Sequence, residues 1–171
     1  NRCRFLSREE ENLILEVSKP RLRNLVIILV DTGARLSEAL DLLWDNVDLD
    51  STNKASITFM RTKNGIPRRI PLTLRAKNLL LELWEAGKNL NKHVFLYHAP
   101  GTHEPVPYKD PHGAWKTTLR ESGVDKSLRI HDLRHTFASR LVSKGVPILD
   151  VSKLLGHKSI TMTMRYPHLA P

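Results

Sequence analysis

Five residues spread over most of the chain carry side chains that suit the transfer of a phosphoryl group. They are Arg35 in T-G-A-R-L-S-E, His131 and Arg134 in H-D-L-R-H, His157 in L-L-G-H and Tyr166 in T-M-R-Y-P-H. Two guanidinium groups can grip one phosphate through paired hydrogen bonds, two imidazoles can donate or relay protons, and a phenol can attack phosphorus. The set predicts phosphoryl transfer through a tyrosine, a chemistry that requires no metal ligands.

The H-D-L-R-H segment also permits a different interpretation. His131 and His135 lie four residues apart with an acid between them, which imitates the H-E-x-x-H of zinc hydrolases. The acid is Asp132, one methylene shorter than glutamate, and the cationic Arg134 would repel a metal dication. Zinc hydrolysis is therefore the weaker alternative, and we expect His135 to be a structural residue that is hydrogen-bonded within the fold.

Three further histidines, His93, His98 and His103, fall in a polar, proline-bearing connection over residues 87–108. Their spacing of five matches no common zinc pattern. We expect a solvated or DNA-facing loop there and no metal site.

The composition favours a globular domain with a polyanionic partner. The chain has 171 residues, enough for one domain with its own core, and 40% of them are hydrophobic. It carries 27 Lys and Arg against 18 Asp and Glu, a net charge of +9. Nucleic acid is the expected partner. A membrane surface is the rival for a basic chain, but there is neither a run of 18 apolar residues nor a helix with a basic face opposite a bulky apolar one.

The single cysteine, Cys3, rules out an internal disulfide and fits a reducing compartment. No apolar stretch of the kind found in signal peptides follows Asn1. We therefore expect a cytoplasmic protein, which a nucleic-acid partner would make nucleoid-associated. Since the sequence opens with Asn1 and not with methionine, we also expect a domain excised from a longer chain.

Apolar spacing and capping residues predict helices over most of the sequence. Ser7 precedes three glutamates, which suit the start of a helix. Residues 25–30 are apolar on all sides, so they predict a buried central helix that ends at Gly33 and leaves Arg35 at a helix junction. Further helices are predicted over residues 74–84, 114–122, 131–144 and 147–155, with a last short one over 161–166.

Alternating apolar residues after Trp44 predict three short antiparallel strands, around residues 47–49, 57–59 and 70–72. Asn64-Gly65 suits a type I′ turn, because both central residues of that turn need positive φ. The turn would place Lys63 at the tip of a hairpin. The expected fold class is therefore mainly α with a small antiparallel β-sheet, an α+β arrangement.

The ordered series of polar residues resembles the tyrosine recombinases, the family of phage and genomic-island integrases and of the recombinases that resolve chromosome dimers. The family order is Arg, Lys, His-x-x-Arg, His, Tyr, and this chain offers Arg35, Lys63, His131, Arg134, His157 and Tyr166. His157 follows Arg134 by 23 residues and precedes Tyr166 by nine, as in many members. Each motif alone is weak, but the ordered series is specific.

This resemblance implies a role for each residue. Arg35 and Arg134 would hold the scissile phosphate, and His157 would hydrogen-bond and pack beside it. His131 would contact the same phosphate and help to handle the tyrosine proton. Tyr166 would form a 3′-phosphotyrosine while Lys63 protonates the leaving 5′ oxygen.

The resemblance also implies the wider setting of the reaction. It implies that residues 1–171 form a single catalytic domain of a site-specific recombinase whose partner is double-stranded DNA. A separate N-terminal DNA-binding domain would complete a clamp around the duplex, and four protomers would act on two duplexes. Accessory DNA-bending proteins can take part, and no cofactor is needed for rejoining.

Four neighbouring residues have supporting roles in this hypothesis. We expect Arg61, Arg68 and Arg69 to contact the DNA backbone. Glu38 is expected either to orient Arg35 or to form a plain surface ion pair. Two alternatives stay open: a chromosome-dimer or transposon recombinase of the same chemistry, and a DNA-binding regulator on an inactive fold of this kind.

Overall fold

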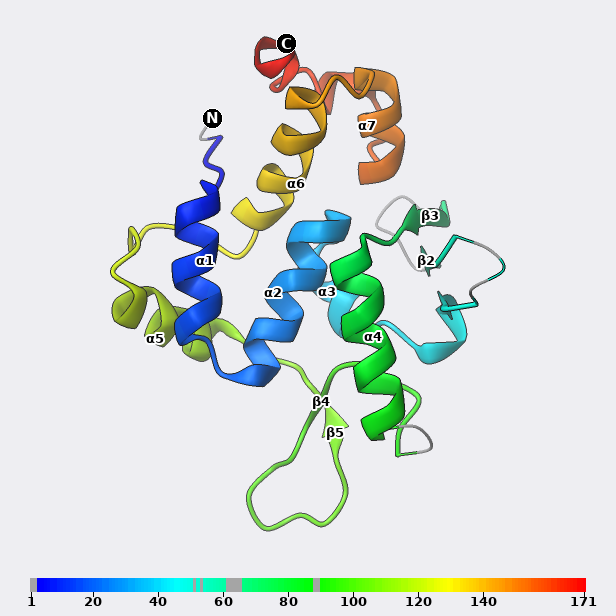
Figure 1. The fold of residues 1–171 in the computed structure, drawn as a ribbon, viewed down its shortest axis with the longest axis vertical. Helices are drawn as coiled ribbons and strands as arrows, with labels where there is room; N and C mark the ends of the chain where they lie inside the picture. The colour runs from blue at the N-terminus through cyan, green and yellow to red at the C-terminus, as the bar shows by residue number, and fades with distance from the viewer. Residues whose placement is uncertain (1–2, 51, 53, 61–65, 88–89) are drawn as a thin grey trace.

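The computed structural model describes residues 3–50, 52, 54–60, 66–87 and 90–171. Its helices are α1 (Arg8–Val17), α2 (Pro20–Thr32), α3 (Leu36–Leu40), α4 (Leu74–Gly87), α5 (His112–Ser122), α6 (Asp132–Ser143) and α7 (Ile148–Leu155). Short 3-10 turns are η1 (Trp44–Asn46), η2 (Ile160–Met162) and η3 (Pro167–Leu169). The fold is mainly α with a small antiparallel sheet, as predicted (Figure 1).

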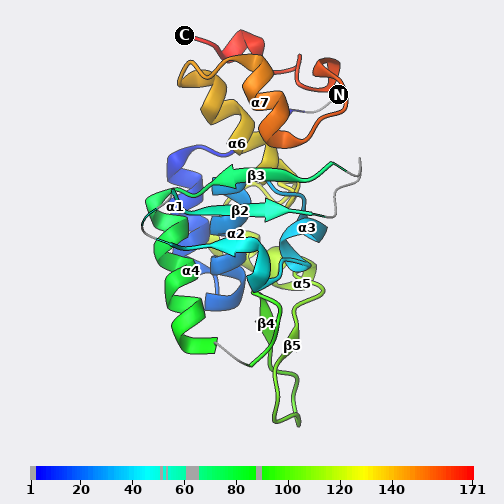
Figure 2. The same cartoon turned by 90° about the vertical axis from the view of Figure 1, so that its right-hand side faces the viewer.

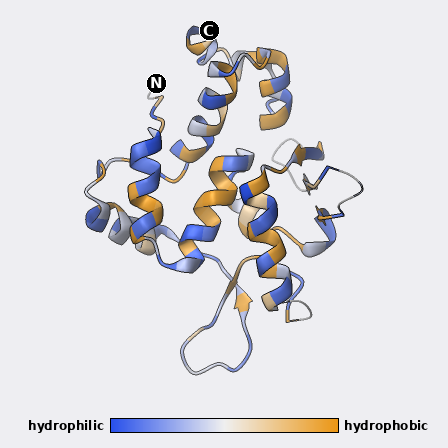
Figure 3. Cartoon of the chain, viewed as in Figure 1, coloured by the Kyte–Doolittle hydropathy of each residue, from blue (hydrophilic) through white to orange (hydrophobic). Residues whose placement is uncertain are grey.

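Helix α2 lies at the centre of the molecule, and a continuous apolar stretch fills its second half (Figure 3). Its residues 25–30 are all buried, as an apolar run without a polar face requires. Pro20 occupies the first turn, and Gly33 ends the helix with φ 69°. A Cβ at Gly33 would lie 2.3 Å from Cδ1 of Phe137, so the end of α2 packs directly on α6.

The predicted three-stranded sheet is present beside α3 and α4 (Figure 2). Strands β1 (Val47–Asp48), β2 (Ser56–Phe59) and β3 (Arg68–Pro71) are antiparallel, and Ile57 faces Ile70 across the β2–β3 pair. The predicted Asn64-Gly65 turn lies outside the described residues. A second pair that the sequence did not indicate, β4 (Leu96–Tyr97) with β5 (Val106–Pro107), closes the extended loop at the bottom of Figure 1.

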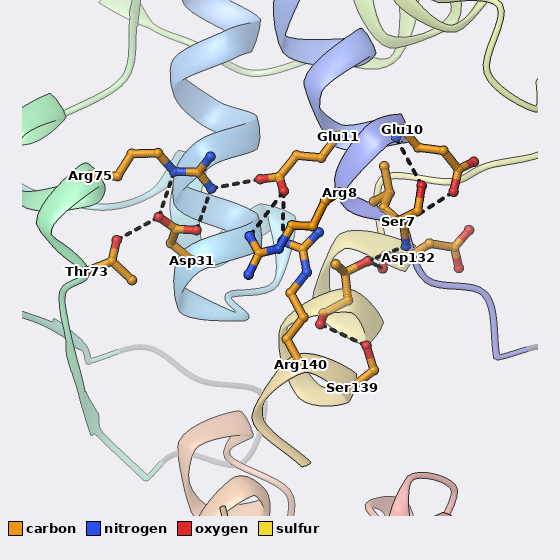
Figure 4. Close-up of polar contacts among 12 residues, drawn as sticks. Ser7, Arg8, Glu10, Glu11, Asp31, Thr73, Arg75, Asp132, Ser139 and Arg140 are labelled. Atoms are coloured by element: carbon orange, nitrogen blue, oxygen red, sulfur yellow. Dashed lines mark hydrogen bonds and ion pairs between the residues drawn. The ribbon is translucent and has the colours of Figure 1, made fainter. Parts of the chain in front are cut away.

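A buried carboxylate joins three helices around Glu11 of α1 (Figure 4). Glu11 pairs with Arg75 of α4 at 2.8 Å and with Arg140 of α6 at 2.9 Å. Arg75 also reaches Asp31 of α2 at 2.6 Å. These ion pairs hold α6 in one position against α1, α2 and α4, and α6 carries three of the residues singled out above.

The C-terminal part of the chain packs as a separate cluster on α6, at the top of Figure 1. Phe137 and Val142 of α6 meet Val151 and Leu155 of α7, and Tyr166 completes this cluster. The expected helix over residues 161–166 is wrong in its length. The 3-10 turn η2 forms there instead, capped by Ser159, and Pro167 opens the next 3-10 turn, η3, at its first position.

In the described ranges, none of the helices is long and apolar enough to span a bilayer.

Candidate active site

Arg134 joins the ends of two helices at the centre of the candidate site. It lies in the first turn of α6 and is 4% exposed. Its Nη1 donates to the carbonyl of Gly33 at 2.7 Å and its Nη2 to the carbonyl of Leu155 at 2.6 Å. Carbonyls at helix C-termini lack intrahelical partners and carry partial negative charge, so they are suitable acceptors for a guanidinium. The side chain is fixed, and a guanidinium has five N–H donors, more than these two bonds use.

Arg35 reaches the same region from the junction between α2 and α3. It occupies the N-cap position of α3, and its backbone N–H donates to Oε1 of Glu38 at 2.8 Å. Nη1 of Arg35 is buried and has no hydrogen-bond partner in the part of the chain that the structure describes. Its distance to Oε2 of Glu38, 3.9 Å, is too long for a hydrogen bond. The Arg35 guanidinium can therefore donate to an anion.

Glu38 contacts Arg35 as expected, but its principal partner is Arg68. Nη1 and Nη2 of Arg68 donate to the two Glu38 oxygens at 2.5 and 2.8 Å, and both side chains are buried. Nε of Arg68 donates to the carbonyl of Leu154 at 2.9 Å. The expected DNA-backbone role of Arg68 needs correction: every guanidinium nitrogen bonds within the protein, and the side chain fastens β3 to α3 and α7.

Arginine side chains outnumber carboxylates around Glu38. Burial, followed by Arg35 and Arg68, lowers the pKa of Arg134 to about 9, which still leaves it charged at neutral pH. Burial alone would raise the pKa of Glu38, but the hydrogen bonds from Arg68 and from the Arg35 backbone outweigh it and the pKa is lowered. Three guanidinium groups thus share one carboxylate, an arrangement that favours binding of an anion.

His157 follows α7 immediately, because Gly156 ends that helix with φ 71°. Its Nδ1 lies 2.6 Å from Oγ1 of Thr163, which fixes the orientation of the ring. Burial, then Arg134 and Arg35, lowers the pKa of His157 to about 4. The imidazole is therefore neutral at pH 7 and lies in the field of both arginines.

His131 is the N-cap residue of α6, one turn before Arg134 and His135. The residue is exposed overall, yet partial burial of the ring and then Arg134 lower its pKa. Its ring meets that of His135 edge-on, with centroids 5.1 Å apart.

Tyr166 belongs to the C-terminal segment, packs against α6 and is 2% exposed. Its hydroxyl is 2.5 Å from Nδ1 of His135, which is also buried. Burial raises the pKa of Tyr166 to about 12, with Cys3 as a further cause, and burial followed by His131 lowers that of His135 to about 4. His135 is hydrogen-bonded within the fold, as expected, but its partner is the predicted nucleophile. No spacing rule in the sequence indicated this contact, since the two residues are 31 positions apart.

The remaining predicted residues divide into two groups. Lys63 and Arg61 lie outside the described residues. Arg69 is exposed on β3, where Nε donates to Oγ of Ser56 at 2.8 Å and Nη2 is 3.9 Å from Asp48. The roles of these three residues stay predictions.

No three His, Cys, Asp or Glu side chains come together as a metal site anywhere in the described ranges.

Residues 4–171 match the family described as the phage integrase family. This chain belongs to that family. It is 34% identical over 178 residues to the integrase of Salmonella phage P22, covering 99% of this chain and 45% of the relative. It is also 34% identical over 157 residues to tyrosine recombinase XerA of Saccharolobus solfataricus, covering 91% and 49%. The chain thus spans about half the length of these relatives.

Solved structures of family members share the fold. The catalytic domain of bacteriophage HP1 integrase is 28% identical, with a TM-score of 0.72 over 99% of this chain and 90% of that domain. XerH recombinase in a post-cleavage complex with its difH substrate is 25% identical, with a TM-score of 0.75 over 97% of this chain and 50% of that one.

Proposed function

We propose that this chain is the catalytic region of a site-specific DNA recombinase that cleaves and rejoins DNA through a 3′-phosphotyrosine. The observation that carries the proposal is that Arg35, Arg134 and His157 lie close together, where helices α2 and α7 end and α3 and α6 begin. The Tyr166 hydroxyl is hydrogen-bonded to His135 of the same helix α6. Family membership and the likeness to a recombinase in a post-cleavage DNA complex support it.

In this mechanism Arg35 and Arg134 bind the non-bridging oxygens of the scissile phosphate and neutralise the charge that develops on them. His131 and His157 are the remaining hydrogen-bond donors to this phosphate. Tyr166 attacks phosphorus, the bond to the 5′ oxygen breaks, and Lys63 supplies a proton to that oxygen. The energy of the phosphodiester is conserved in the tyrosyl ester, so rejoining needs no cofactor.

A basic groove beside His157 supports double-stranded DNA as the partner. The groove, about 370 Å³ in volume, lies between the start of β3 and the end of α7, and Arg69, Lys153 and Lys158 line it. Lysine and arginine next to a cleavage site suit contacts with neighbouring phosphates, which position a duplex without reading its bases.

The wider assembly is part of the same proposal. This region aligns with 90% of the HP1 integrase catalytic domain, which supports a single catalytic domain that acts with other parts of a longer recombinase. Recombination then takes four protomers on two duplexes, with accessory DNA-bending proteins where the site requires them. The motifs suit a phage or island integrase and a chromosome-dimer or transposon recombinase equally.

One observation favours a second candidate, a DNA-binding regulator that does not cleave. Tyr166 is almost completely buried, whereas a nucleophile has to meet its substrate. The two functions differ in one product, because only the recombinase forms a covalent bond to DNA.

The experiment uses a pool of nicked duplexes with randomised sequence, in which loss of a short fragment traps the covalent intermediate. The protein is incubated with the pool in EDTA, and a denaturing gel separates adducts, whose DNA is then sequenced. We expect an adduct with the parent chain and none with Tyr166→Phe, which should bind the pool equally well. Binding without any adduct from the parent would favour the regulator, and an adduct from Tyr166→Phe would place the nucleophile elsewhere.

A further inference from the structure

The hydroxyl of Tyr166 and Nδ1 of His135 form a buried pair that the mechanism above leaves without a task. The two atoms are 2.5 Å apart, and both residues are shielded from solvent. A phenol that is about to attack phosphorus has to lose its proton, and a general base must lie within hydrogen-bond reach of that proton. His135 meets this condition in the structure.

Helix α6 places this pair next to the phosphate-binding arginine. His135 follows Arg134 directly, and Arg134 is fixed by the carbonyls that end α2 and α7. The Glu11–Arg140 ion pair fixes the far end of the same helix. Helix α6 therefore positions both Arg134, which binds the phosphate, and His135, which binds the phenol.

We propose that His135, in place of His131 to which the family resemblance gives this task, is the immediate proton acceptor of Tyr166 and hence a catalytic residue, an inference that rests on the proposed function. As the Tyr166 oxygen bonds to phosphorus, its O–H bond breaks and the proton passes to Nδ1 of His135, while Nε2 keeps its own proton. The bond from phosphorus to the 5′ oxygen breaks, and that oxygen takes a proton from Lys63. In rejoining, the imidazolium returns its proton to the departing tyrosyl oxygen.

The proton moves during the attack and not before it. With a neutral imidazole of pKa about 4 beside a phenol of pKa about 12, prior transfer is strongly unfavourable. The phenol oxygen becomes less basic as its bond to phosphorus forms. A phosphate held by Arg35 and Arg134 also brings negative charge toward the start of α6, which stabilises the imidazolium.

His135→Asn separates proton transfer from positioning. The amide oxygen can still accept a hydrogen bond near the place of Nδ1, but it cannot take up the proton. We expect DNA affinity and the unfolding midpoint to stay close to those of the parent, while adduct formation slows by at least about 100-fold. The matched control is Ser139→Ala, one turn further along α6, whose buried hydroxyl bonds to the carbonyl of Thr136. It should cleave like the parent.

A second substitution tests the chemistry directly. Difluorotyrosine at position 166 has a more acidic phenol, which ionises with less help, so it should restore most of the lost rate to His135→Asn. Parent-like or faster cleavage by His135→Asn would overturn the proposal, the faster case showing that His135 restrains the tyrosine. A loss that fluorination does not repair would reduce His135 to a positioning residue. If His135→Asn fails to fold, His135→Gln takes its place in the same comparison.

The outcome for His135 is distinguishable from the outcome for the proposed function. No adduct from the parent or from Ser139→Ala would contradict the recombinase function itself. Adducts from both, together with a fully active His135→Asn, would contradict only the role of His135.

Discussion

Arg134 donates to the carbonyl of Gly33 at a distance of 2.7 Å, so the residue that ends the central helix also orients the side chain expected to hold the scissile phosphate. The glycine is required there for two reasons: its φ is 69°, and a Cβ would collide with Phe137 of α6. The segment around Gly33 thus ends α2, allows α2 to pack on α6 and positions the Arg134 guanidinium.

This relationship predicts a double defect for Arg134→Ala. Two buried carbonyls lose charge-assisted hydrogen bonds, so the free energy of unfolding should fall by about 2 kcal/mol or more. Loss of a transition-state donor should slow adduct formation by at least about 100-fold. Chemical denaturation and the suicide-DNA assay measure the two effects. Arg120→Ala, at an exposed position of α5, is the control and should show neither.

Arg35→Ala should separate the two defects. Its Nη1 has no hydrogen-bond partner among the described residues, so its loss should change the free energy of unfolding much less than the loss of Arg134. The cleavage rate should still fall by about 100-fold or more, because a donor to the phosphate is gone. A variant that cleaves normally once DNA is saturating would show that Arg35 only contributes to DNA affinity.

Arg68→Ala tests whether this arginine belongs to the protein interior or to the DNA interface. The substitution leaves the Glu38 carboxylate buried without its principal partner, which should lower the free energy of unfolding by about 3 kcal/mol. A DNA-backbone contact would instead leave unfolding unchanged and reduce the salt dependence of DNA binding. Arg69→Ala, at the next and exposed position of β3, is the matched comparison.

The Glu38–Arg68 pair also predicts how stability responds to acid. The folded state lowers the pKa of Glu38 below its ordinary value of 4.5. The ionised carboxylate therefore stabilises the fold fully above that value, and this contribution disappears as the pH falls through the lower pKa of the folded state. Denaturation curves should show the gap between the parent and Glu38→Gln narrowing below about pH 4.5. A gap that stays constant into acid would show that Glu38 ionisation contributes little.

Local signals explain why most of the fold could be predicted from the sequence. Some sequence features determine the structure only of the residues next to them. Examples are the apolar run at residues 25–30 and the glycines that end α2 and α7. Arg35 at a helix junction and His157 just after a helix followed from the same signals. Chain-local rules of this kind cannot show which distant groups meet.

Two features of the site that the sequence did not reveal depend on contacts between distant residues. Arg68 resembles its neighbour Arg69 in the sequence, yet it bonds to Glu38, 30 positions away, and to Leu154, 86 positions away. The bond between His135 and Tyr166 forms only because the C-terminal turns pack on α6. Both the internal hydrogen bonds of Arg68 and the His135–Tyr166 contact, on which the proposed proton transfer rests, therefore required the tertiary structure.

Lys63 is the residue whose predicted role makes the most specific chemical demand. If it protonates the leaving 5′ oxygen, it should matter only while that oxygen needs a proton. Lys63→Ala should cleave ordinary DNA slowly. It should recover most of the parent's rate on DNA in which sulfur replaces the bridging 5′ oxygen, because a thiolate departs without protonation. Arg35→Ala should stay slow on both substrates, since its defect lies in charge stabilisation. Equal defects of Lys63→Ala on both substrates would mean that the lysine positions DNA, and the general acid would then have to be another group.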